Sequence, residues 1–236
     1  MAETPRLAHL MMLLFLGSAF TTAAGLATVV FGTVLRAKQA TRMGGLLAIA
    51  CACGYGIVLL GTGVLSSSKT LGEGERKYFC EPDCHIAYSI ESVRTAAILG
   101  TETNGSPANG EFVVVQLKSW FDENSISRHR GNGPLTPVPR LVSLEDSNGR
   151  RYFPTQVKAS AMQEASTPLV QPLRPGESYL SSFVFDVARD AKDLRLLITD
   201  DDPISVITID HENSPFHGKI FLGLRPPGVS SAAENR

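Results

Sequence analysis

Residues 173–187, LRPGESYLSSFVFDV, join a turn signal to a strand signal. Pro175 and Gly176 occupy the centre of a predicted type II turn, because proline fixes the first backbone angle and glycine accepts the positive second one. The side chains after the turn alternate between apolar and polar, which is typical of a strand with one buried face. The apolar members of this face are Tyr179, Phe183, Phe185 and Val187.

Strand patterns recur on both sides of this stretch, separated by turn signals. The clearest is EFVVVQLKSWF, residues 111–121, and a hairpin is predicted where an Asn-Gly turn at 147–149 separates two apolar runs. The other predicted strands are 86–98, 194–200, 204–210 and 219–224. Seven or eight short strands with almost no helical pattern predict an antiparallel β-sandwich of immunoglobulin-like type over residues 86–224.

The run LRPGESYLSSFVFDV followed by LRLLITD (194–200) resembles bacterial immunoglobulin-like extracytoplasmic domains of unknown function. The resemblance covers roughly residues 86–224. It implies a fold and a location, since such domains are commonly tethered to membranes or lipid anchors. It supplies no catalytic residues.

Two long apolar stretches precede the predicted sandwich, at 7–35 and 43–65. Each exceeds the roughly 20 apolar residues that span a bilayer. A basic turn, RAKQATR (36–42), separates them, so residues 1–66 are predicted to form a transmembrane helical hairpin. Residues 67–85 are predicted as a polar tether with a cysteine pair, and 225–236 as a disordered tail.

The hairpin puts both chain ends on one side of the membrane. Arg36, Lys38 and Arg42 make the turn the densest basic segment, which favours a cytoplasmic turn under the positive-inside rule. Cysteines before a proline-rich β domain also suit an oxidising compartment. The prediction is a bacterial inner membrane protein with both termini and the β domain on the periplasmic side. A cleaved signal peptide is disfavoured, because the first apolar run is too long.

Both predicted helices are rich in small residues, which let helix backbones approach closely in lipid. These faces are expected to pack the two helices on each other or onto other membrane subunits. The predicted packing residues are Gly17, Ala24, Gly25, Gly32, Gly45, Ala52, Gly56 and Gly63.

The stretch KYFCEPDCHIAY, residues 77–88, permits three interpretations. Cys80 and Cys84 can form a local disulfide. They can attach haem covalently with His85 as axial ligand, although the usual C-x-x-C-H pattern is one residue shorter. They can also bind copper or zinc with His85 and a fourth ligand from His211 or His217.

Two loops are candidate partner-binding surfaces, because loops on a rigid scaffold commonly carry function. One is 122–139 and the other is 210–219; the second is not an H-E-x-x-H helix, since its histidines are too far apart and Pro215 intervenes. The candidate contact residues are Arg128, His129, Arg130, His211, Glu212 and His217.

The net charge and the motifs of the sequence exclude several classes of function. A net charge of -1 argues against nucleic acid binding, and no nucleophile, phosphate-loop or dinucleotide motif is present. The expectation is a non-enzymatic accessory subunit without cofactor, which binds other proteins in a larger integral membrane complex, respiratory or photosynthetic. The alternative is a redox protein or a metal- or haem-binding protein that uses Cys80, Cys84 and His85.

Overall fold

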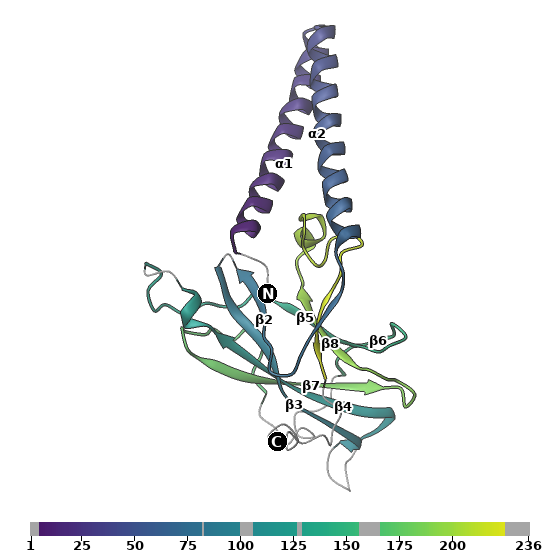
Figure 1. Cartoon of the computed structure of the whole chain (residues 1–236). Coiled ribbons are helices and arrows are strands. Elements are labelled where there is room, and N and C mark those ends of the chain that lie inside the picture. The colour runs from purple at the N-terminus through teal and green to yellow at the C-terminus, as the bar shows by residue number, and fades with distance from the viewer. Residues whose placement is uncertain (1–4, 82, 100–105, 127–128, 156–165, 225–236) are drawn as a thin grey trace, which may run out of the picture. The chain divides into compact units, whose positions relative to one another are not determined.

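The computed structural model describes residues 5–81, 83–99, 106–126, 129–155 and 166–224 (Figure 1). Within these residues the chain forms two compact units. The first contains the chain up to Ser68 and the segment Asp202–Lys219; the second contains Lys69–Asp201 and the chain from Ile220. The predicted tail 225–236 lies outside the described residues.

The second unit contains two β-sheets, which are mostly antiparallel. One sheet has the strand order β1-β9-β8-β5-β6 and the other has the order β2-β3-β4-β7. Only the pairing of β1 with β9 is parallel among the described ladders. The strands are β1 Lys69–Leu71, β2 Lys77–Glu81, β3 Asp83–Leu99, β4 Ser106–Phe121, β5 Arg140–Glu145, β6 Arg151–Tyr152, β7 Ser178–Val187, β8 Arg195–Asp200 and β9 Ile220–Gly223.

A shared apolar core joins the two sheets into a β-sandwich, as predicted. From the second sheet it takes alternate residues of β4 and β7, such as Val113 and Phe185, and from the first it takes Leu144 and Ile198. Phe185 and Val187 are buried in this core and Tyr179 and Phe183 pack against it, which confirms the predicted inward face. The turn before β7 is also confirmed, since Gly176 has a φ of 82°.

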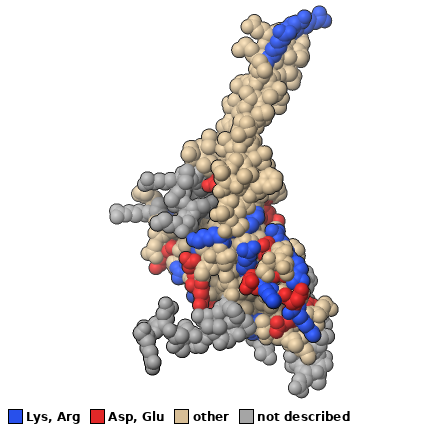
Figure 2. All heavy atoms as spheres, turned by 45° about the vertical axis from the view of Figure 1, so that its right-hand side comes forward, with Lys and Arg blue, Asp and Glu red and all other residues tan. Residues whose placement is uncertain are grey.

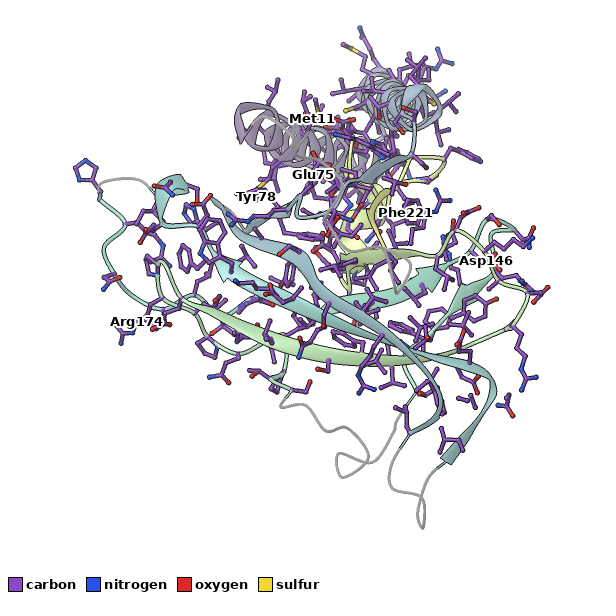
Figure 3. All side chains as sticks on the ribbon, turned by 60° about the horizontal axis from the view of Figure 1, so that its bottom comes forward. Met11, Glu75, Tyr78, Asp146, Arg174 and Phe221 are labelled. Atoms are coloured by element: carbon purple, nitrogen blue, oxygen red, sulfur yellow. The ribbon has the colours of Figure 1, made fainter. Side chains whose placement is uncertain are left out.

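The β5–β6 hairpin forms around the predicted Asn-Gly turn, and Gly149 has a φ of 76°. Asp146, at the turn end of β5 in Figure 3, organises it. Its carboxylate accepts hydrogen bonds from the backbone amides of Asn148 and Arg150, from Arg150 Nε and from the Tyr152 hydroxyl. Burial raises the pKa of Asp146, but these hydrogen bonds outweigh it and hold that pKa below its usual range.

Two predicted boundaries of the β domain were wrong. Residues 204–210 are not a strand: Pro203–Ile207 forms the short 3-10 helix η3, because the Asp202 carboxylate accepts from the Ile204 amide and Pro203 starts the turn. The predicted tether 67–85 contains β1, β2 and the start of β3. Its polar sequence hid these strands, since β1 is exposed and β2 begins with the buried cation Lys77.

The first unit contains helices α1, Pro5–Val34, and α2, Lys38–Leu65. Both are long and apolar enough to cross a membrane by length and composition. In Figure 2 the visible helix surface is tan between the basic turn and the β unit. Helix α2 starts five residues earlier than the predicted 43, because the basic turn residues Lys38 and Arg42 continue the helix.

Tyr88 of β3 is fully buried, and no described residue accepts a hydrogen bond from its hydroxyl. Burial raises the pKa of this hydroxyl above its usual range, and the nearby Tyr179 raises it further. Burial is also the main cause that raises the pKa of Tyr78, Tyr152 and Tyr179. The folded sandwich therefore keeps protons that the unfolded chain loses.

We expect the stability of the sandwich to be lost on the alkaline side. A folded pKa above the unfolded value leaves stability unchanged below about pH 10. Above that pH the deeply buried Tyr88 lowers the free energy of unfolding by about 1.4 kcal/mol per pH unit, and the more exposed tyrosines lower it less. Tyr88→Phe should make the free energy of unfolding fall less steeply with pH above about pH 10. It should also raise the free energy of unfolding at neutral pH by about 1 kcal/mol, since a buried hydroxyl without an acceptor is removed. Urea unfolding of the full chain in detergent at several pH values measures both.

Tyr78→Phe is the matched control. The Tyr78 hydroxyl donates to Asp122 Oδ2 at 2.9 Å, so its removal should lower neutral-pH stability by about 1 kcal/mol. Equal destabilisation by both phenylalanine variants would contradict the assignment of Tyr88.

Candidate functional site

The segment between β8 and β9, residues 202–219, is the candidate site; it is called the 202–219 segment below. It starts with η3, continues through tight turns and carries two residues with left-handed backbone, Asp210 (φ 62°) and Phe216 (φ 63°). It belongs to the same compact unit as the two helices. Sequence analysis placed His211, Glu212 and His217 here.

The 202–219 segment contacts the C-terminal half of helix α2. The Tyr55 hydroxyl donates to the Ile207 carbonyl at 2.5 Å. A Cβ at Gly63 would lie 2.2 Å from the Pro215 carbonyl oxygen, so this close approach requires glycine. After the helix ends, Ser66 Oγ accepts from the Gly218 amide at 2.6 Å. The segment is therefore fixed to α2 at three levels.

The predicted contact residues of this segment are used in its own hydrogen bonds. His211 Nδ1 accepts from the Asn213 amide at 3.0 Å, and His217 Nε2 lies 3.3 Å from Asp210 Oδ1. Lys219 Nζ donates to the Glu212 carbonyl, and Glu212 is 9% exposed. These side chains stabilise the loop, and partner binding by them remains a prediction.

Apart from Asp202, the exposed residues of the 202–219 segment are apolar. Ile204, Val206, Ile207 and Phe216 are 54%, 45%, 46% and 76% exposed. The sequence predicts a strand over 204–210 and places Phe216 in a polar loop, so neither prediction indicates an exposed apolar group here. The signal that could have found them is Asp202-Pro203, a typical start of a short helix.

The other predicted loop surface lies at one end of β4. Arg130 stacks over the Phe121 ring at 4.7 Å and donates to the Gly133 carbonyl at 2.7 Å. His129 is exposed, and Arg128 lies outside the described residues. This loop is held by Arg130, and what it contacts is untested.

His85 is buried in the sandwich unit, on β3. Its ring stacks on Phe121 with centroids 5.4 Å apart, and Nδ1 lies 2.6 Å from Ser125 Oγ. His211 and His217 belong to the other compact unit. Within the described part of the chain, no three His, Cys, Asp or Glu side chains lie close enough together to hold a metal ion.

The cysteine pair lies on the hairpin formed by β2 and β3. Phe79 pairs with Ile86 and Glu81 with Asp83, with a register shift between them. Cys80 lies at this register shift and Cys84 lies on the facing strand of the same hairpin. Their side chains are outside what the structure describes, so the disulfide, haem and metal interpretations stay predictions.

A buried cationic cluster in the sandwich was not predicted. Arg140 of β5 forms an ion pair with Asp200 of β8, and its guanidinium lies 4.1 Å above the Phe79 ring. Lys77 Nζ donates to the carbonyls of Ile198 at 2.6 Å and Ile220 at 2.9 Å. The charges are placed by partners that are distant in sequence, so no local motif indicates them.

The predicted small residues have different surroundings. A Cβ at Gly25 would lie 2.9 Å from Gly44 O and one at Gly32 2.7 Å from Thr41 Oγ1, so α1 and α2 pack closely at these two points. Gly63 instead contacts the 202–219 segment. The remaining predicted residues are Gly45, near Val29; Gly17 and Gly56, without a neighbour within 4 Å of an added Cβ; and the exposed Ala24 and Ala52.

No family model and no curated protein matches this sequence. Among solved structures, the chain is similar to the secreted protein MPT63 of Mycobacterium tuberculosis, at 10% identity and a TM-score of 0.42, over 66% of this chain and 97% of that one. An uncharacterised β-sandwich protein from Clostridium difficile 630 gives 12% identity and a TM-score of 0.39, over 68% and 96%. The yjhA protein from Bacillus subtilis has 11% sequence identity and a TM-score of 0.39, over 65% of this chain and 98% of that one. Similarities this weak carry no inference about function.

Proposed function

We propose that this chain is a non-enzymatic, membrane-anchored accessory subunit whose β-sandwich binds other proteins within a larger integral membrane complex. The observation that carries the proposal is a pair of apolar helices, only 6% and 17% buried over their most apolar windows, in one chain with a folded sandwich. Helix surface this apolar requires lipid or protein around it. If the helices bind the complex within the bilayer and the sandwich binds it outside the bilayer, each contact raises the effective concentration of the other.

The location and the finer fold class belong to the same proposal. A cytoplasmic basic turn places both termini and the sandwich on the periplasmic face of a bacterial inner membrane. An immunoglobulin-like assignment is supported by the chain's exchange between sheets: β4 and β7 belong to one sheet, and β5, β6 and β8 to the other.

Native extraction tests the proposed function. The full chain is solubilised from its own membranes in mild detergent and separated on a native gel. Co-migration with a larger complex, lost on harsher detergent treatment, is the expected result. Migration as a monomer or small oligomer in the mildest detergent would contradict an accessory role.

The cysteine pair fits a cross-strand disulfide better than a haem or metal site. A disulfide requires Cα atoms about 4.4–6.8 Å apart, a separation within reach of two cysteines on facing strands of one hairpin. His85, the third residue of the haem and metal interpretations, already stacks on Phe121 and contacts Ser125. A ligand role would require the ring to leave the sandwich core.

We therefore expect the purified chain to be two hydrogens lighter than its reduced form, and the Cys80→Ser, Cys84→Ser double variant to lose about 2 kcal/mol of stability, the loop-closure value for a five-residue ring. Intact mass under non-reducing conditions and urea unfolding measure these. The Cys51→Ser, Cys53→Ser variant, which changes the two helix thiols, is the control. An added haem mass or bound copper or zinc would favour the redox alternative.

A further inference from the structure

Residues 203–209, PISVITI, contain no charged residue, although the 202–219 segment is otherwise polar. Ile209 is buried, whereas Ile204, Val206 and Ile207 are about half exposed. Phe216 adds a ring that is 76% exposed. These four exposed residues, called the apolar tip below, do not stabilise the fold by burial.

The backbone conformation at Phe216 also does not favour a phenylalanine. Its φ of 63° lies in the left-handed region, which is unfavourable for an aromatic residue. Neither burial nor backbone conformation accounts for phenylalanine at this position. Its contribution must come from what covers the ring outside the described chain.

The position of the apolar tip along α2 identifies what covers it. Arg42 is the last charged residue of α2, and Tyr55 follows it by thirteen residues. At about 1.5 Å per residue, Tyr55 lies roughly 20 Å from Arg42, which is less than the roughly 30 Å of a hydrocarbon core. The Ile207 carbonyl is hydrogen-bonded to Tyr55, so it lies at membrane depth when α2 spans the bilayer.

Several polar groups of this part of the segment are hydrogen-bonded within it, which lowers the cost of a low-dielectric environment. Asp202 accepts from the Ile204 amide, and Ser205 Oγ donates to the Asp202 carbonyl. Thr208 Oγ1 donates to the Ile204 carbonyl at 2.9 Å. Asn213 Nδ2 donates to Ser205 Oγ at 2.9 Å.

We propose that the apolar tip inserts into the lipid bilayer beside α2, in the leaflet opposite the basic turn. This inference rests on the proposed membrane anchoring. Gly63, which contacts Pro215, lies roughly 12 Å beyond Tyr55 along the helix. Ile207 therefore reaches deeper than Phe216, which lies near the headgroups. Insertion of about 5–10 Å is typical of interfacial segments.

Single-tryptophan fluorescence tests the proposal, since Trp120 is the only tryptophan. In a Trp120→Phe background, Ile207→Trp and Phe216→Trp are introduced into the full chain. The protein is reconstituted in phosphatidylcholine vesicles with a minority of phosphatidylglycerol, with bromine placed high or low on the acyl chains. Leu47→Trp, half exposed on α2, is the positive control, and Phe153→Trp, 68% exposed in the sandwich unit, is the aqueous control.

Both tip variants are expected to lose most of their emission to brominated lipid and little to aqueous iodide. Ile207→Trp should respond more than Phe216→Trp to deep bromine. If both behave like Phe153→Trp while Leu47→Trp is quenched by lipid, the insertion is refuted and the anchor stands. If Leu47→Trp is not quenched by lipid, the anchor itself fails. Protection from iodide without quenching by lipid would mean that protein covers the tip, which also overturns the proposal.

Discussion

Asp200→Ala should lower the free energy of unfolding of the sandwich by about 3–5 kcal/mol, the usual effect of removing one partner from a buried ion pair. The Arg140 side chain is 1% exposed and Asp200 17% exposed, so the substitution removes a carboxylate that pairs with a buried guanidinium. The Phe79 ring beneath Arg140 offers a cation–π contact, which is too weak to replace a carboxylate in the core. Urea unfolding of the full chain in detergent measures the loss.

Asp190→Ala is the matched control, because it removes the same group from a solvent-exposed pair. Asp190 is 73% exposed and lies 3.1 Å from Arg150. Exposed pairs contribute about 0–1 kcal/mol. The Arg140→Met, Asp200→Ala double variant should be more stable than Asp200→Ala alone, since the uncompensated charge is gone. A loss below about 1 kcal/mol for Asp200→Ala would mean that water reaches Arg140.

The sandwich was predictable where the sequence pattern is local. Alternation in β4 and β7 and the two glycine turns depend on residues within a few positions of one another. The pattern failed where a distant partner decides the structure. β1 is a strand because β9 pairs with it. Lys77 can be buried because two carbonyls, from β8 and β9, accept hydrogen bonds from its ammonium group.

The 202–219 segment shows the same limit at the candidate site. Its histidines and Glu212 are predicted to contact a partner, yet both histidine rings and the Glu212 carbonyl form hydrogen bonds or polar contacts within the loop. The sequence predicts a strand over 204–210 and a polar loop over 210–219, so the four residues of the apolar tip fall in two different predicted elements and do not stand out as one exposed group. Contacts between residues about 150 positions apart, Tyr55 with Ile207 and Gly63 with Pro215, place the tip beside α2.

Phe185→Ala should have an effect as large as that of Asp200→Ala, for a different reason. Phe185 is fully buried near the end of β7, opposite Val113 of β4, and its backbone forms an isolated bridge with Pro154. Truncation of a buried phenylalanine removes apolar contact and leaves a cavity, a loss of about 3–5 kcal/mol. Val113 and Pro154 belong to the chain segments on either side of β7 at Phe185, so the cavity weakens contacts among three segments. We therefore expect a single cooperative unfolding transition with its midpoint at a lower urea concentration.

Phe153→Ala is the control for this prediction, because Phe153 is 68% exposed and its change should stay within about 0.5 kcal/mol. Phe185→Leu separates volume from shape: a substitution that keeps most of the volume should lose less than about 1.5 kcal/mol. The stretch 173–187 specifies the fold through its turn and its inward face, and Phe185 is the residue of that face with no exposed surface. If Phe185→Ala and Phe153→Ala unfold together, the two sheets do not share the core that defines the sandwich.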